Sequence, residues 1–205
     1  MTALLLFVKH HCPWMWRAME WLNAVLFRCR YRDIRKRAAE ILSHQTVPGF
    51  RFAPVAASDL PALSHFLESQ PEQRLTWFHP HSFEMPELRR LWRGGALLMM
   101  KVERETDGKM AGYFFLRCFF IGRAFHGLLV DATADGRGIG TAMWRLSAQI
   151  CEAAGLSMYA TVSTANEASL NSCRKGTAAR IVRRLPNGFL LVACRVARRG
   201  DEKAL

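Results

Sequence analysis

The sequence lacks several patterns that mark large classes of protein. Its six cysteines include no Cys-x-x-Cys pair, which argues against a zinc site and a disulfide framework and suits a reducing compartment. No run of about 20 largely uncharged residues is present, so a spanning helix is not indicated. No small-residue cleavage site follows the apolar start of the chain, so a signal peptide is not indicated either. We expect a cytoplasmic protein with no metal site.

Acidic residues are also few relative to basic ones. Seventeen Asp and Glu stand against 29 Lys and Arg, for a formal net charge of +12 and a pI near 10.1. Such an excess indicates an anionic partner, whether nucleic acid, an acidic membrane surface, or the phosphates of a cofactor or substrate. Because no recognised nucleic-acid motif accompanies the charge, we expect no nucleic-acid partner.

Apolar residues are abundant enough to build a core. Half of the 205 residues are hydrophobic and 11% are aromatic, which excludes disorder for most of the chain. The length suits one domain with some additional chain.

The most informative segment runs from Phe125 to Leu146. An apolar run ends in a turn that contains Gly136, Gly138 and Gly140, and the turn opens into a helical pattern. Glycine tolerates positive φ and lets a ligand approach the backbone. A helix N-terminus adds unpaired N–H groups and the positive end of the helix dipole. The segment therefore predicts a phosphate-binding loop between a strand and a helix.

Two common phosphate-binding loops do not fit this segment. A Walker loop needs Gly-x4-Gly-Lys-Ser/Thr, and no such lysine follows the glycines. A dinucleotide-binding loop needs Gly-x-Gly-x-x-Gly and an acidic residue about 20 positions later. The spacing from Gly136 to Gly140 differs from that pattern, and the preceding strand lies far along the chain.

The loop does resemble the acetyl-CoA loop of the GNAT N-acetyltransferases, Arg/Gln-x-x-Gly-x-Gly/Ala. Both glycines match, at Gly138 and Gly140, whereas Asp135 stands where the family has Arg or Gln. Arg137 leaves a cation in the loop for a phosphate.

A second segment is similar to the family pattern Asn-x-x-Ser/Ala-x5-Lys-x-Gly-Phe. Asn166, Ser169 and Lys175 are in register, although Gly176 comes one residue early and the phenylalanine is missing. A helical pattern that stops at Gly155 and a short strand pattern separate the two segments, as the resemblance requires.

The resemblance implies the GNAT fold, an α/β (α+β) architecture with a mixed central sheet of about seven strands flanked by helices. We expect strands over residues 50–55, 96–105, 109–122, 126–130, 156–162, 178–185 and 188–196. We expect helices over residues 14–27, 58–69, 86–92 and 139–154. The predicted parts are a helical extension over residues 1–48, the acetyltransferase domain over 49–197, and a polar tail over 198–205.

The predicted helix in the extension is amphipathic. Arg17, Glu20 and Asn23 form a narrow polar stripe, and the opposite side carries Trp14, Ala18, Trp21, Leu22 and Val25. A cluster of arginines follows the helix. Two interpretations stay open: a helix lying on an anionic membrane surface at the inner face of the membrane, or one packed on the domain or at a homodimer interface.

The resemblance also implies the cofactor, acetyl-CoA, and the residues that bind it. The pantetheine arm would pair with the strand at Leu128, Leu129 and Val130, where an amide would polarise the thioester carbonyl. The pyrophosphate would lie on the amides of Gly136, Arg137, Gly138, Ile139, Gly140 and Thr141. Asn166 and Ser169 would complete the site.

Two proton transfers remain to be assigned. As base, His126 lies on the strand before the loop, while His79 and His81 lie in a loop expected over the acceptor site. As acid, the family's tyrosine position is occupied by Cys173, and Tyr159 is the second candidate.

The acceptor is expected to be a small-molecule amine, an amino sugar of surface-polysaccharide biosynthesis, because the Phe-His-Pro-His segment resembles that of bacterial members with such substrates. A peptide or protein amine is the first alternative. A non-catalytic CoA-binding protein is the second, since Asp135 and Cys173 depart from the family pattern.

Overall fold

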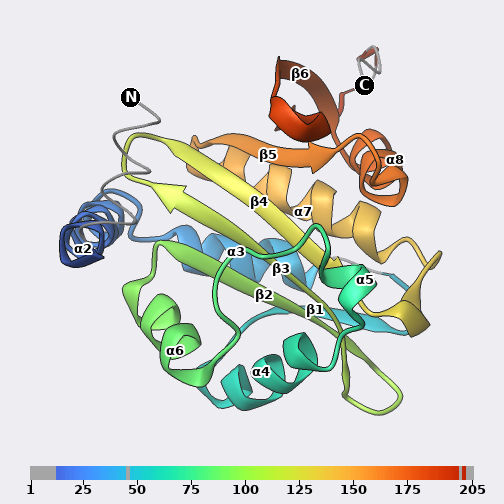
Figure 1. Cartoon of the computed structure of the whole chain (residues 1–205), viewed down its shortest axis with the longest axis horizontal. Helices are drawn as coiled ribbons and strands as arrows, with labels where there is room; N and C mark the ends of the chain where they lie inside the picture. Colours follow the sequence, from blue (N-terminus) through green and yellow to red (C-terminus); the bar gives the residue numbers. More distant parts are fainter. Residues whose placement is uncertain (1–12, 45–46, 199, 202–205) are drawn as a thin grey trace.

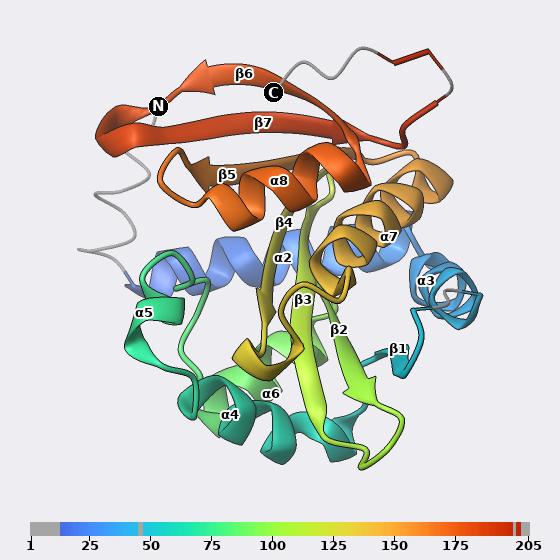
Figure 2. The same ribbon diagram turned by 90° about the vertical axis from the view of Figure 1, so that its right-hand side faces the viewer.

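The computed structural model describes residues 13–44, 47–198 and 200–201. The first part of the predicted extension (1–12) and the end of the predicted tail (202–205) lie outside the described residues. Seven strands form a single mixed sheet with helices on both faces, which confirms the predicted fold (Figures 1 and 2). The strands are β1 (Phe50–Pro54), β2 (Leu97–Arg104), β3 (Met110–Phe119), β4 (Arg123–Val130), β5 (Ser157–Ser163), β6 (Ala178–Arg184) and β7 (Phe189–Arg195). The helices are α2 (Pro13–Arg30), α3 (Ile34–Ser43), α4 (Leu60–Glu68), α5 (Glu72–Leu75), α6 (Met85–Gly94), α7 (Ile139–Ala154) and α8 (Glu167–Gly176), with 3-10 turns η1 (Ala57–Asp59), η2 (Ala132–Ala134) and η3 (Pro186–Gly188).

The strand order places a parallel pair in the middle of the sheet. The order is β1-β2-β3-β4-β5-β7-β6, and every neighbouring pair is antiparallel except β4 and β5. The parallel register joins residues 123–125 to residues 157–159. Beyond Phe125 and Tyr159 the two strands separate, and this separation positions the site described below.

Side chains on the central strands alternate between two cores, as the period of a strand requires. Phe114 and Leu116 of β3 pack with α3 and α7 on one face of the sheet. Tyr113 and Phe115 pack with α4 and α6 on the other. The helix that follows the glycine loop ends at Gly155, which is left-handed with φ +68°, as predicted.

Helix α3 was not predicted, although its pattern is present in the sequence. Ile34, Ala38 and Leu42 are buried at a spacing of four residues, and they join the core beside α7 and β1. Because Arg35, Lys36 and Arg37 lie between Ile34 and Ala38, this narrow apolar stripe is hard to recognise in the sequence. The core therefore contains residues from both sides of the predicted boundary between residues 48 and 49. The division of the chain into an extension and a domain stays a prediction.

Helix α2 packs on the domain through the buried Ala24 and Phe27 and through Glu20 and Asn23 of its polar stripe. The Asn23 side chain donates to the Cys118 carbonyl (3.0 Å) and accepts from the Phe120 N–H (3.1 Å). Glu20 forms an ion pair with Arg90 (2.9 Å). These contacts direct Glu20 and Asn23 toward α6 and the C-terminal end of β3, whereas Arg17 stays exposed.

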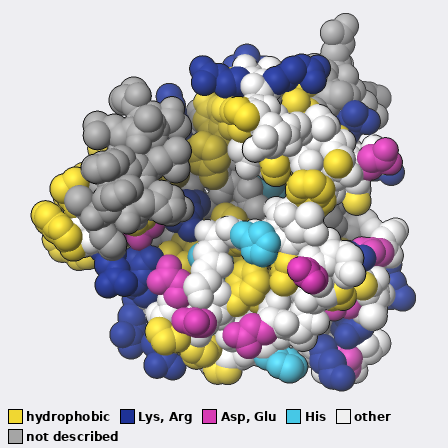
Figure 3. Space-filling view, in the orientation of Figure 1, with side chains coloured by type: hydrophobic (Ala, Val, Ile, Leu, Met, Phe, Trp, Pro, Cys, Tyr) yellow, Lys and Arg dark blue, Asp and Glu magenta, His cyan; other side chains and the backbone are white. Residues whose placement is uncertain are grey.

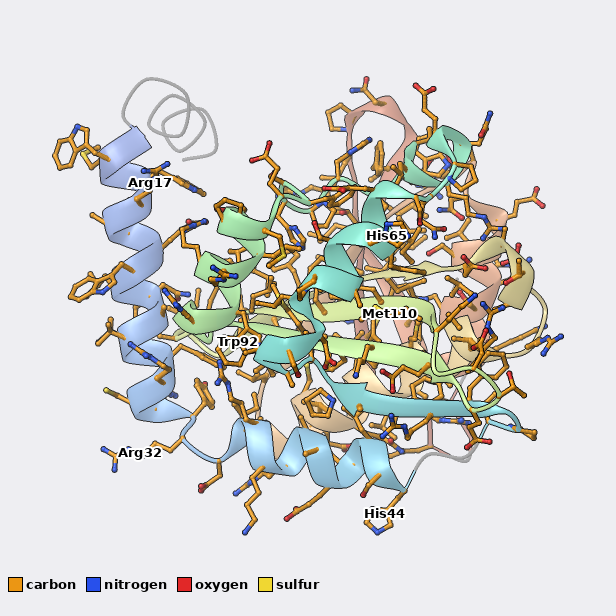
Figure 4. The ribbon with its side chains drawn as sticks, turned by 90° about the horizontal axis from the view of Figure 1, so that it is seen from below. Arg17, Arg32, His44, His65, Trp92 and Met110 are labelled. Atoms are coloured by element: carbon orange, nitrogen blue, oxygen red, sulfur yellow. The ribbon has the colours of Figure 1, made fainter. Side chains whose placement is uncertain are left out.

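The apolar side of α2 is consequently exposed. Trp14 is 71% exposed, Trp21 67% and Leu22 51%. Figure 4 shows α2 along one side of the molecule, between the labels of Arg17 and Arg32, with side chains that point away from the domain. Within the described part of the chain, no helix combines the length and apolar character needed to cross a bilayer.

Candidate active site

A cavity of about 940 Å³ lies where β4 and β5 separate. Its walls come from both strands, from α5 and the segment after it, from the loop before α7, and from α8, which Figure 2 shows around the open strand ends. The volume is in the range of cofactor-sized sites. Ten of the eleven residues predicted to bind the cofactor line this cavity: Leu128, Leu129, Val130, Gly136, Gly138, Ile139, Gly140, Thr141, Asn166 and Ser169.

The glycine loop presents backbone N–H groups to the cavity. Gly136 and Gly138 have φ of +72° and +82°, a left-handed conformation that other residues adopt only with strain. Gly138 caps α7 without a side-chain hydrogen bond, so the first N–H groups of this helix, at Ile139 and Gly140, line the cavity without a capping side chain. Such an end favours an anion, and the loop therefore fits a phosphorylated cofactor.

A cation from α5 contacts the loop. Arg74 donates to Asp135 Oδ1 (3.0 Å) and to the Val130 carbonyl (3.1 Å), and a second guanidinium nitrogen also contacts Asp135. Arg137, the cation expected within the loop, lies instead over the ring of Phe50, 5.8 Å from its centroid, and does not line the cavity.

Helix α8 forms the wall opposite α5. Asn166 caps this helix by accepting from the Ser169 N–H (3.0 Å), so its side-chain oxygen serves the fold. Ser172 and Lys175, one and two turns further along, line the same wall. Helix α8 can pack this closely on α7 because Gly176 has no side chain: a Cβ there would meet the Thr141 carbonyl at 2.6 Å.

His126 is the one sequence-predicted catalytic residue that lines the cavity. Its side chain is buried, 7% exposed, with its ring centroid 4.3 Å from that of Trp144. Neither ring nitrogen has a hydrogen-bond partner of normal geometry within the described chain. Burial lowers the pKa of His126 to about 3, opposed only in part by the Phe115 carbonyl. The imidazole is therefore uncharged at neutral pH and has an unused acceptor nitrogen.

Aromatic side chains form part of the cavity wall beside the end of β5. Trp77 and Phe189 meet edge to face with centroids 5.9 Å apart, and Phe78 lies beside Trp77 in the chain. Trp77 is 45% exposed, so its ring is accessible to a ligand.

The other four predicted catalytic residues lie outside this cavity. His79 is exposed in the loop after α5. His81 hydrogen-bonds to the buried Tyr113 hydroxyl (3.2 Å), and burial lowers its pKa. Tyr159 stacks on Phe125 (5.8 Å) and lines a second cavity of about 500 Å³. Cys173 is on the buried side of α8, where its sulfur lies 3.9 Å from that of Cys194.

Several cavity residues were missed by sequence reasoning. Trp144 follows the loop on α7, and its buried Nε1 lacks a partner within the described residues. Its helical spacing is that of an ordinary core residue, which conceals the contact with His126. Arg74, Trp77 and Phe189 have no local signal, because they reach the cavity only through the tertiary fold.

Comparison with known proteins agrees with this geometry. The family model described as Acetyltransferase (GNAT) family matches residues 65–176, more than half of the chain. No curated protein matches the chain significantly.

Solved structures share the fold at low sequence identity. Mycobacterium smegmatis RimJ in complex with CoA-disulfide is 22% identical, with a TM-score of 0.55 over 70% of this chain and 80% of that one. A GCN5-related N-acetyltransferase from Kribbella flavida is 17% identical, with a TM-score of 0.58 over 74% and 100%. A ribosomal-protein-S5-alanine acetyltransferase from Vibrio fischeri is 13% identical, with a TM-score of 0.58 over 74% and 95%. The chain therefore belongs to the GNAT family of N-acetyltransferases, which use acetyl-CoA.

Proposed function

We propose that this acetyltransferase acetylates the primary amine of an amino sugar and that His126 is its proton acceptor. The observation that carries the proposal is that the buried imidazole of His126 and the accessible ring of Trp77 line the same cavity. Acetyl-CoA supplies the acetyl group in activated form.

His126 acts as an uncharged base in this scheme. With a pKa near 3, its imidazole cannot efficiently take a proton from a free ammonium ion, so the amine loses its first proton to solvent. As the amine nitrogen gains a bond, its remaining protons become far more acidic. The unused acceptor nitrogen of His126 then takes one of them without first having to release a proton of its own. The thioester C–S bond breaks as the amide forms, and the departing thiolate takes up a proton from solvent.

The aromatic wall supports a sugar as the acceptor. Trp77 and Phe189 offer apolar ring surface in the same cavity as His126, and the C–H face of a sugar ring packs well on such a surface. A diphosphate attached to the sugar would suit the net charge of +12.

A peptide or protein amine is the main alternative acceptor. Solved neighbours of the same fold include the ribosomal-protein-S5-alanine acetyltransferase named above and a spermidine N-acetyltransferase chimera. Identities of 13% and 14% relate them to this chain by fold alone, and fold does not determine the acceptor. A non-catalytic CoA-binding protein is the remaining alternative.

An acceptor panel tests the proposal. Release of free CoA thiol is measured with a nucleotide-linked amino sugar, a free amino sugar, an alanine-initiated peptide and spermidine. We expect the highest kcat/KM for an amino sugar, with a reduction of about tenfold in Trp77→Ala, because stacking on the indole is lost. Val182→Ala, which truncates an exposed residue of β6, is the control. Preference for the peptide would overturn the amino-sugar assignment, and no turnover with any amine would leave a CoA-binding role.

We also propose that the outward face of α2 docks on an anionic membrane surface. Hydrophobic side chains lie over α2 at the left edge of the face in Figure 3. Trp14, Trp21 and Leu22 supply the apolar contact, and exposed cations lie in the last turn of the helix at Arg28 and Arg30 and just after it at Arg32. This combination suits the interfacial region of an anionic bilayer.

Vesicle co-sedimentation at low salt tests this second proposal. We expect binding to phosphatidylcholine vesicles that contain phosphatidylglycerol, and little binding to phosphatidylcholine alone. Trp21→Glu should abolish binding, whereas Val182→Glu, a matched change on the exposed side of β6, should not. Failure of the native chain to sediment with anionic vesicles would overturn the proposal. Dissociation of a dimer by Trp21→Glu would instead assign this face to a homodimer interface.

A further inference from the structure

The phosphate-binding loop has no cation of its own directed into the cavity. Its first position holds the carboxylate of Asp135, which is 54% exposed. The guanidinium of Arg137 lies over Phe50 and does not line the cavity. Within the loop itself, only backbone N–H groups could hold a phosphate, and they would do so next to a negative side chain, which is unfavourable; the other cations that line the cavity are Arg74 of α5 and Lys175 of α8.

Arg74 reaches this loop from a distant part of the chain. It belongs to α5, 61 residues before Asp135, and it lines the same cavity as Gly136, Gly138 and Thr141. Its side chain is 28% exposed, so it is held in place and still open to the cavity.

The contacts of Arg74 fix its guanidinium at the edge of the loop. Two of them go to the Asp135 carboxylate and one to the Val130 carbonyl at the end of β4. They use three of the five N–H donors of an arginine, which leaves capacity for a further acceptor. The hydrogen bond with Asp135 raises the pKa of Arg74, which therefore stays charged throughout the working range of pH.

We propose that Arg74 supplies the cation for the acetyl-CoA phosphates in this chain and that Asp135 is the positioning residue that holds it there. Helix α5 thus supplies the positive charge that an arginine at the first loop position would supply in the family pattern. The pair also neutralises Asp135, which would otherwise repel the same phosphates.

A purely structural role predicts a different outcome for two variants that break the same ion pair. Arg74→Ala removes the cation and keeps the carboxylate. Asp135→Arg removes the carboxylate and restores the cation of the family pattern. If the pair only clips α5 to the loop, both variants should weaken CoA binding alike. If Arg74 is the cation that binds the phosphates, Arg74→Ala should weaken CoA binding and Asp135→Arg should not.

Calorimetric titration with CoA separates these cases. Arg74→Ala should raise Kd by about tenfold or more, the loss expected for a charge-assisted contact. Asp135→Arg should bind as tightly as the native chain or more tightly, and Arg74→Ala/Asp135→Arg should recover most of the loss. The salt dependence of Kd should be shallower in Arg74→Ala than in the native chain.

Controls keep the test independent of folding and of general charge. Arg183→Ala removes the same charge from the exposed side of β6, outside the cavity, and should leave Kd within about twofold of native. Arg74→Gln provides a milder change, and thermal unfolding of each variant without CoA confirms that it is folded. An unchanged Kd in Arg74→Ala or Arg74→Gln, or equal losses in Arg74→Ala and Asp135→Arg, would overturn the proposal. Because CoA binding requires no acceptor, the result is independent of the amino-sugar assignment.

Discussion

The imidazole of His126 lies against the indole of Trp144, with ring centroids 4.3 Å apart. The two residues come from β4 and α7, on either side of the phosphate-binding loop. Both have buried ring nitrogens without a hydrogen-bond partner of normal geometry among the described residues. The indole keeps water from one side of the imidazole, which is why His126 stays uncharged and available to a ligand in the cavity.

Replacement of His126 should affect turnover more than cofactor binding. We expect His126→Asn to lower kcat by about tenfold or more, the usual contribution of a positioned proton acceptor, with little change in Kd for CoA. Steady-state kinetics with the best acceptor and calorimetry with CoA measure the two effects. His79→Asn, in the exposed loop outside the cavity, is the control. Native kcat in His126→Asn would indicate that the proton leaves through water.

Burial of His126 should make stability depend on pH. Its pKa is lowered from 6.5 to about 3 on folding, so the unfolded chain takes up a proton that the folded chain rejects. Stability contributed by the neutral ring is full above pH 6.5 and is lost as the pH falls toward 3. Between about pH 7 and pH 5 we expect a loss of about 2 kcal/mol in the free energy of unfolding.

Urea denaturation at these two pH values measures that loss. His126→Asn should lose about 2 kcal/mol less than the native chain over the same interval. The lowered pKa of His81 acts in the same direction in both proteins and cancels in the comparison. Equal losses in the two proteins would contradict a buried, neutral His126.

The close approach of α7 and α8 should not tolerate a side chain at Gly176. A Cβ there would lie 2.6 Å from the Thr141 carbonyl and 2.8 Å from Trp144 Cβ, so a helix would have to shift. We expect Gly176→Ala to destabilise the fold by about 1–3 kcal/mol, as overpacking does. At Gly94 the nearest atom would be 4.0 Å away, so Gly94→Ala should be neutral or slightly stabilising in thermal unfolding.

A bulky residue in the glycine loop should block the cofactor site. Gly138 has φ +82° and lines the cavity, so Gly138→Trp would strain the loop and fill the space in front of its N–H groups. We expect calorimetry to detect no CoA binding to this variant. Gly108→Trp, at a φ of +67° in the β2–β3 turn, imposes similar strain outside the cavity and should bind CoA normally. Normal binding in Gly138→Trp would mean that the cofactor lies elsewhere.

Much of the fold could be predicted because its signals are local. The loop between β4 and α7 depends on three glycines within five residues, and the end of α7 depends on Gly155. All seven strands fall within the predicted stretches to within a residue or two, apart from the earlier start of β4. Helix α3 was not predicted because charged residues surround its three buried positions.

Only part of the site could be predicted from such local signals. Residues of the loop and of α8 belong to motifs, so ten of the eleven predicted cofactor residues line the cavity. Of the five predicted catalytic residues, only His126 lines it. The direction in which a histidine or tyrosine points depends on which strands separate and which stay paired, and no single segment contains that information.

The sequence by itself therefore determined the family, the order of elements and the position of the phosphate-binding loop, because each depends on backbone preferences and spacing within one segment. Tertiary structure decided which cation serves the loop, which side of α2 faces outward and which histidine lies in the cavity. Arg74 and Asp135 are 61 residues apart, and Asn23 is 97 residues from Phe120. Such pairs form only when the packed sheet brings distant segments together, since their energy comes from contact and burial.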